Sequence, residues 1–182
     1  SDRVKSLPHC RILDDEKDIW ELGSIAPAHY AVISEIVNYI AWIGKLYIDS
    51  KDKRTLLEEG MRRIHLQEQA LLARMLYGDK GKTGLLNLDG VDCFFDYTNL
   101  AGRDLILAMK LSGFGYAEAV REYEKRGIIV YERVAESSYS KRMVESFGLD
   151  GIIRVSPLHC NTAEEIDRFL NITNEILDSK RS

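Results

Sequence analysis

Apolar residues recur at helical spacing in two long segments of the N-terminal half. From Pro27 to Ile43 an apolar face repeats every three or four residues. Proline suits the first turn of a helix, because its missing N–H would have no partner there. From Lys53 to Tyr77 apolar residues again follow one side, interrupted by Glu68. The pattern predicts two long helices, and the glycines and lysines of residues 78–82 predict a turn after them.

The second half mixes strand and helix patterns. Glycines at 127 and 148 suit helix C-termini, and Thr162 with Glu165 forms a capping box that begins the last helix. We expect an α+β fold, in which a small antiparallel or mixed sheet is covered by helices and preceded by the two long helices. Strands are predicted at residues 91–97, 104–111, 128–131 and 152–156, and helices at 116–126, 140–147 and from 161 onward.

These patterns divide the chain into three parts. Residues 1–25 form a polar lead-in, residues 26–82 a helical connector, and residues 83–182 the α+β C-terminal domain. A domain of this length can bury a core of its own.

Composition and net charge argue against some classes of binding partner. The net charge is −4, and the basic residues are scattered among acidic ones, which argues against nucleic acid. No apolar stretch approaches the ~20 residues that a membrane helix needs, so we expect no membrane partner. The chain has 3 cysteines, far apart, which favours a reducing, cytoplasmic location over a secreted disulfide framework.

Arg154 is the candidate binding residue of the second half. It interrupts the apolar run of the 152–156 strand, just before Ser156 and Pro157. A guanidinium offers a planar fork that pairs with a carboxylate, and a strand end would hold it in place. The pattern alone still favours a plainer interpretation, an edge-strand arginine paired with a surface acid.

A family resemblance favours the carboxylate-binding interpretation of Arg154. Residues 152–170, IIRVSPLHCNTAEEIDRFL, resemble the C-terminal signature of the class V aminotransferase group of pyridoxal-phosphate enzymes. Within the group they are most similar to the cysteine desulfurase-like and selenocysteine lyase-like branch. Residues 126–151, and WELGS at 20–24 with the helix after it, resemble the preceding family segments. The resemblance implies the small domain of a fold-type I enzyme that acts on an amino acid. The complete enzyme would be a homodimer with pyridoxal 5′-phosphate as its cofactor.

The resemblance also implies roles for single residues. Arg154 falls at the arginine that holds the substrate α-carboxylate. Ser24 falls at a threonine whose hydroxyl reaches the cofactor phosphate of the neighbouring subunit, although Ser24 could instead cap the helix after it. Arg133, in a predicted loop at residues 132–139, could be a second anion contact or simply solvated. His159 could line the substrate pocket.

Two departures from the family limit what this chain can do. The Schiff-base lysine of the group typically follows a histidine, and no lysine here does. We therefore assign no catalytic residue and expect the chain to be incomplete and inactive by itself. Related desulfurases carry a nucleophilic cysteine on the loop matching residues 132–139, which contains none, and this argues against persulfide chemistry.

Two alternatives remain beside this interpretation. The chain could be a non-enzymatic interaction domain derived from such an enzyme. It could also be a free-standing small-molecule binder unrelated to pyridoxal phosphate, which is the weaker alternative. A metal site is not supported. The pairs His9-Cys10 and His159-Cys160 lack the spacing that converging zinc ligands need, so no metal is expected.

Overall fold

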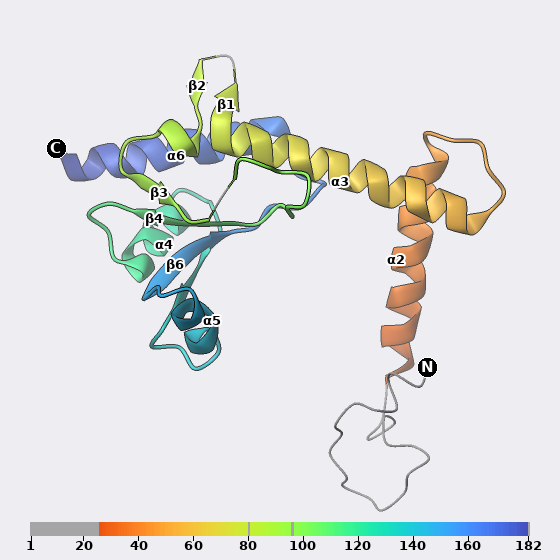
Figure 1. The fold of residues 1–182 in the computed structure, drawn as a ribbon, viewed down its shortest axis with the longest axis horizontal. Helices are drawn as coiled ribbons and strands as arrows, with labels where there is room; N and C mark the ends of the chain where they lie inside the picture. The colour runs from red at the N-terminus through yellow and green to blue at the C-terminus, as the bar shows by residue number, and fades with distance from the viewer. Residues whose placement is uncertain (1–25, 80, 96, 182) are drawn as a thin grey trace, which may run out of the picture. The chain divides into compact units, whose positions relative to one another are not determined.

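A computed structural model describes residues 26–79, 81–95 and 97–181 of the 182-residue chain (Figure 1). It divides into two compact units, residues 1–60 and 61–182. Helix α3 runs across this division, and the boundary predicted near residue 82 stays a prediction. The elements are α2 (Pro27–Lys45), α3 (Lys53–Tyr77), β1 (Gly78–Asp79), β2 (Lys82–Thr83), the 3-10 helix η1 (Leu85–Asn87), β3 (Val91–Cys93), β4 (Leu107–Leu111), α4 (Tyr116–Lys125), β5 (Tyr131–Val134), α5 (Lys141–Ser146), β6 (Gly151–Val155) and α6 (Ala163–Arg181).

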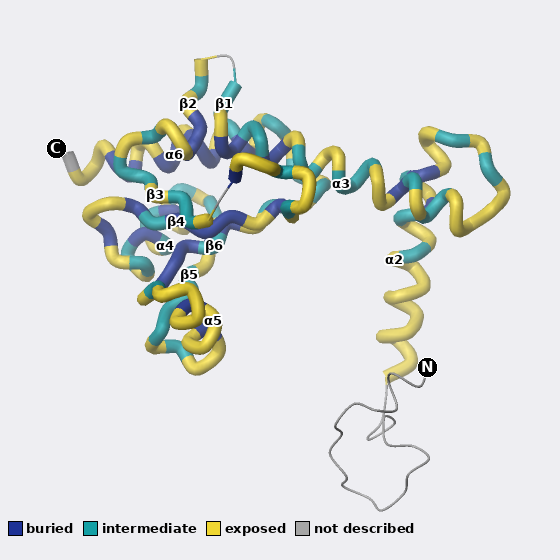
Figure 2. Tube along the Cα trace, viewed as in Figure 1, coloured by how far each residue is buried: buried dark blue, intermediate teal, exposed yellow. Residues whose placement is uncertain are grey.

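In the first unit, α2 crosses the start of α3 at two glycines. A Cβ added at Gly44 would overlap the carbonyl oxygen of Leu56, and one added at Gly60 would overlap that of Ile40. The backbones of α2 and α3 therefore approach more closely at this crossing than side chains would permit. Asp52 caps α3 by accepting a hydrogen bond from the Thr55 amide at 2.9 Å. Most of α2 lies exposed, as its yellow tube in Figure 2 shows.

The crossing predicts an unfavourable effect for Gly60→Ala. Alanine would raise helix propensity by about 1 kcal/mol, but its methyl group would meet the backbone carbonyl of Ile40, which cannot turn aside. We expect α2 to separate from α3, so that its amides exchange with deuterium at least tenfold faster. Gly102→Ala is the control, because a Cβ there meets nothing within 4 Å. Equal exchange of the α2 amides in both variants would contradict the crossing.

The second unit is built on a four-stranded sheet of order β3-β4-β6-β5 in which every pairing is antiparallel. Alternate residues of β4 and β6 point to opposite faces. Leu107 and Met109 of β4, with Ile153 and Val155 of β6, enter a core shared with α3, α4 and α6. This arrangement confirms the predicted α+β fold and small antiparallel sheet. The largest fully buried side chains are Tyr123, Leu72, Met75, Leu76, Leu85, Leu107, Met109, Leu111, Ile153, Ile176, Val144 and Thr173.

Polar side chains define the start of α6 and join this helix to α3. The predicted capping box is confirmed, because Thr162 N donates to Glu165 Oε2 at 2.8 Å and Glu165 N donates to Thr162 Oγ1 at 3.2 Å. Arg74 of α3 donates to both carboxylate oxygens of Asp167 on α6, at 2.7 and 2.9 Å, and this pairing lowers the Asp167 pKa. The bidentate pair fixes α3 against α6.

The predicted strand at 128–131 is wrong by three residues, since β5 spans Tyr131–Val134. The cause is the end of α4. Gly127, at φ 73°, donates to the Glu124 carbonyl, and Ile128 donates to that of Tyr123, which forms a Schellman motif. Ile128 therefore completes the helix cap, and the strand starts later. Arg133 consequently lies in β5 and not in a loop.

The other helices and strands were predicted with boundary errors of zero to four residues. The helices at 27–43, 53–77, 116–126 and 140–147 are confirmed to within two residues at each end. The strands predicted at 91–97 and 104–111 shorten to Val91–Cys93 and Leu107–Leu111. The predicted turn at 78–82 contains β1 and the first residue of β2, which pair as a two-stranded hairpin that the sequence pattern did not indicate.

Candidate functional site

Arg154 lies on the face of the sheet opposite the helix-covered core. Its neighbours Ile153 and Val155 are buried in that core, so period-two alternation turns Arg154 and Ile152 to the other side. Strand β6 lies between β4 and β5, where Arg154 is paired with Ala108 and with Tyr131. Ladders on both sides therefore hold its backbone.

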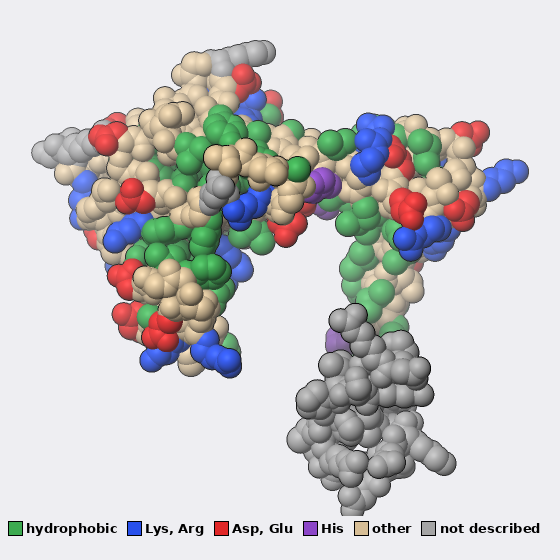
Figure 3. Space-filling model, viewed as in Figure 1, with side chains coloured by type: hydrophobic (Ala, Val, Ile, Leu, Met, Phe, Trp, Pro, Cys, Tyr) green, Lys and Arg blue, Asp and Glu red, His purple; other side chains and the backbone are tan. Residues whose placement is uncertain are grey.

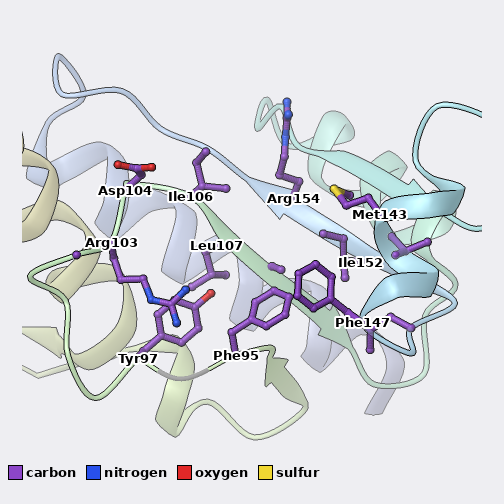
Figure 4. Close-up of a pocket in the computed structure, with 14 residues that line it drawn as sticks. Phe95, Tyr97, Arg103, Asp104, Ile106, Leu107, Met143, Phe147, Ile152 and Arg154 are labelled. Carbon is purple, nitrogen blue, oxygen red and sulfur yellow. The ribbon is translucent and has the colours of Figure 1, made fainter. Parts of the chain in front are cut away.

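A cavity of about 330 Å³ opens on this face (Figure 4). Its wall is mainly apolar, and Figure 3 shows hydrophobic side chains gathered on the side of this unit where β6 and α5 lie. The lining residues are Phe95, Tyr97, Gly102, Arg103, Asp104, Ile106, Leu107, Ala108, Met143, Val144, Phe147, Leu149, Ile152 and Arg154.

The Arg154 guanidinium has an unused donor in this wall. Its Nε is buried and has no hydrogen-bond partner among the described residues. An unsatisfied buried donor costs about 1–3 kcal/mol, more when it belongs to a charged group, so native proteins rarely retain one. An anion that accepted a hydrogen bond from Nε would remove this cost. Because Nε exposes almost no surface, an anion in the cavity would reach it only after the Arg154 side chain shifts.

An aromatic pair lines the same cavity. The rings of Phe95 and Phe147 meet edge to face, with centroids 4.9 Å apart and an interplanar angle of 67°. Both remain open to solvent, at 45% and 60% exposure. Tyr97 adds a neutral phenol, since burial raises its pKa, and the Arg103 guanidinium lies 5.2 Å from the centre of its ring.

The structure brings only part of the predicted site together. Arg133 of β5 is paired with Ile152 of β6, so its side chain leaves the sheet on the same face as Arg154. Its Nη1 donates to the Glu132 carbonyl at 2.9 Å, and Arg133 does not line the cavity. His159 lies in the turn after β6, also outside the lining. Ser24 lies outside the described residues. The roles of all three stay predictions.

Sequence reasoning missed the aromatic wall. Phe95 was read as part of a strand and Phe147 as the end of a helix, and neither pattern indicates a shared cavity. One local signal exists only in the structure: Phe95 has φ 75°, a left-handed conformation that a bulky residue rarely adopts. Such strained residues cluster at binding sites.

Cys93 and Cys160 should differ in reactivity. Burial is the main cause that raises the Cys93 pKa to about 11, whereas Cys160 is exposed. Because the thiolate is the nucleophile, we expect iodoacetamide at pH 8 to modify Cys160 at least tenfold faster than Cys93. Peptide mapping by mass spectrometry against time measures both rates. Faster modification of Cys93 would contradict the burial of its thiol.

The described residues offer no metal centre and no membrane helix. They contain no group of three or more His, Cys, Asp or Glu side chains placed to hold an ion. No helix among them is both long and apolar enough to span a bilayer.

Comparisons with known proteins were made at three levels. No protein-family model matches the chain, and no curated protein matches it. Among solved structures, the apo cysteine desulfurase from Thermococcus onnurineus NA1 matches with a TM-score of 0.57 and 21% identity, over 70% of this chain and 29% of that one. The cysteine desulfurase CsdA (S-sulfonic acid) from Escherichia coli has a TM-score of 0.48 and 15% identity, over 74% of this chain and 33% of that one.

The likeness to the Thermococcus onnurineus enzyme concerns the fold. At 21% identity it shows that the chain folds like one part of a cysteine desulfurase, and the chain spans 29% of that enzyme's length.

Proposed function

We propose that the chain is the substrate-facing C-terminal part of a pyridoxal-phosphate enzyme of the class V aminotransferase group, in the cysteine desulfurase-like or selenocysteine lyase-like branch. Arg154 binds the α-carboxylate of an amino-acid substrate. The observation that carries this proposal is the buried Arg154 Nε without a partner in the cavity wall. The desulfurase-like fold and the signature at residues 152–170 support it.

The placement of Arg154 suits this role. Its backbone belongs to β6, which pairs with β4 on one side and with β5 on the other, so the guanidinium has a fixed origin. Its unused donor lies in a largely apolar wall, where a charge-assisted hydrogen bond is stronger than in water. Arg154 therefore binds and orients a substrate.

The cavity does not fit pyridoxal phosphate by itself. The cofactor needs a lysine amine, yet none of the described residues that line the cavity is a lysine. No lysine of the chain follows a histidine either. Cofactor chemistry therefore belongs to the rest of a longer, homodimeric enzyme, to which Ser24 would contribute a phosphate contact.

Two positions of the chain bear on persulfide chemistry. No cysteine lies in residues 132–139, after the start of β5, and Cys93 carries a raised pKa. Neither position supplies a thiolate nucleophile. We therefore propose no persulfide step at either of these positions, and a transferase or lyase activity for the complete enzyme.

The proposal is tested by titrating the chain with L-alanine while the Arg154 Nε–Hε signal is followed by NMR. L-alaninamide at equal ionic strength is the matched control, because it lacks the carboxylate. We expect L-alanine to shift the Arg154 signal with millimolar affinity and the amide to leave it in place. An Arg154 signal that responds to neither compound, or equally to both, refutes the carboxylate role.

A further inference from the structure

The cavity that contains Arg154 continues over the sheet to the aromatic pair. In Figure 4, Arg154 lies at one side, Phe95 and Phe147 lie together at another, and Ile152 lies between. We infer that the site selects an amino acid with a large aromatic side chain, whose ring packs on Phe95 and Phe147 while its carboxylate binds Arg154. This inference rests on the proposed function and adds the class of substrate.

The chemistry of the wall carries the first step. The described lining side chains around the aromatic pair, such as Met143, Leu149 and Ile152, carry no charge. Among the described residues, the charged ones that line the cavity besides Arg154 are Arg103 and Asp104, of opposite sign. Arg103 already lies over the Tyr97 ring. A charged substrate side chain would lose its hydration at the aromatic end without gaining a partner among the described residues there.

The aromatic pair carries the second step. Phe95 and Phe147 keep 45% and 60% of their surfaces exposed although they contact each other. Edge-to-face geometry leaves ring faces and edges free for a third aromatic ring. A short side chain, such as that of alanine, would leave these surfaces in water.

The backbone of Phe95 is the independent observation. Its φ of 75° is costly for a bulky residue, and glycine or asparagine would adopt it more readily. The strained conformation holds a phenyl ring at the cavity and not in the core. Strained backbone conformations of this kind are typical of residues at binding sites.

The cavity volume sets the size of the occupant. About 330 Å³ lies at the lower end of the range of small-molecule sites, roughly 300–1,000 Å³. One aromatic amino acid fits this size class, whereas a peptide or a whole cofactor with substrate calls for more room.

The test compares L-phenylalanine, L-alanine and L-glutamate as probes of the chain, with Kd values taken from the Arg154 Nε–Hε shift. We expect L-phenylalanine to bind at least tenfold more tightly than L-alanine and L-glutamate. Phe147→Ala should reduce that preference at least fivefold. Leu158→Ala is the matched control, since Leu158 is likewise 60% exposed but lies outside the cavity, and it should retain the preference.

The outcomes separate this inference from the proposed function. Equal affinity for L-alanine and L-phenylalanine, or a preference for L-glutamate, overturns the aromatic selection and leaves the carboxylate role standing. Retention of the preference in Phe147→Ala also overturns it. Failure of all three amino acids to move the Arg154 signal overturns the carboxylate role, and this inference with it.

Discussion

Ile153→Ala is expected to lower the free energy of unfolding by about 2–5 kcal/mol. Ile153 is 1% exposed on β6, the strand paired on both sides, and its side chain belongs to the core shared with α3, α4 and α6. Removal of three carbons leaves a cavity among side chains that the sheet and helices hold in place. The loss therefore includes both the transfer term and the cavity term.

Urea denaturation followed by circular dichroism measures this loss. Ile129→Ala is the matched control, because it removes the same atoms from a side chain that is 78% exposed. Its effect should stay within about 0.5 kcal/mol. If the two variants lose equal stability, Ile153 does not lie in the core described above.

Arg154→Met should have the opposite effect on stability. Methionine keeps an unbranched apolar side chain but removes the buried Nε that has no partner. We expect the free energy of unfolding to rise by about 1 kcal/mol, because the desolvation cost of the unpaired donor disappears. Carboxylate binding should fall by about 10-fold to 100-fold, the loss of a hydrogen bond to a charged group.

Urea denaturation of the variant measures the change in stability. An L-alanine titration measures the change in binding, and it is followed by the NMR signals of other residues because the variant has no Arg154 Nε–Hε signal. Arg121→Met on α4 is the control for loss of a positive charge, since Arg121 is exposed. It should change neither stability nor binding. A loss of stability in Arg154→Met would mean that Arg154 is a structural residue, as the plainer interpretation of the sequence holds.

Local sequence signals predicted much of the fold. The capping box at Thr162 and Glu165, and the glycine ends of α4 and α5, act within a few residues, so their chemistry can be read directly from the chain. The error at β5 arose where two local signals compete. Ile128 has the β-branched character of a strand residue, yet the Schellman motif after Gly127 uses its amide first.

The site was predicted less completely, because it depends on contacts between distant segments. Arg154 was identified through a continuous motif. Phe95 and Phe147 are 52 positions apart in the sequence, and only the folded sheet places their rings 4.9 Å from each other. The left-handed backbone of Phe95 is likewise invisible in a run of residues that reads as a strand.

Arg154 and Phe147 belong to different parts of the second unit. Arg154 lies within the central strand β6, whereas Phe147 directly follows α5, a helix of six residues. Under the proposed function, mutations around α5 would change which substrate side chain is accepted without disturbing the strand that carries Arg154. If the proposed site is correct, positions 143 and 147 are the targets for changing its selectivity while Arg154 stays in place.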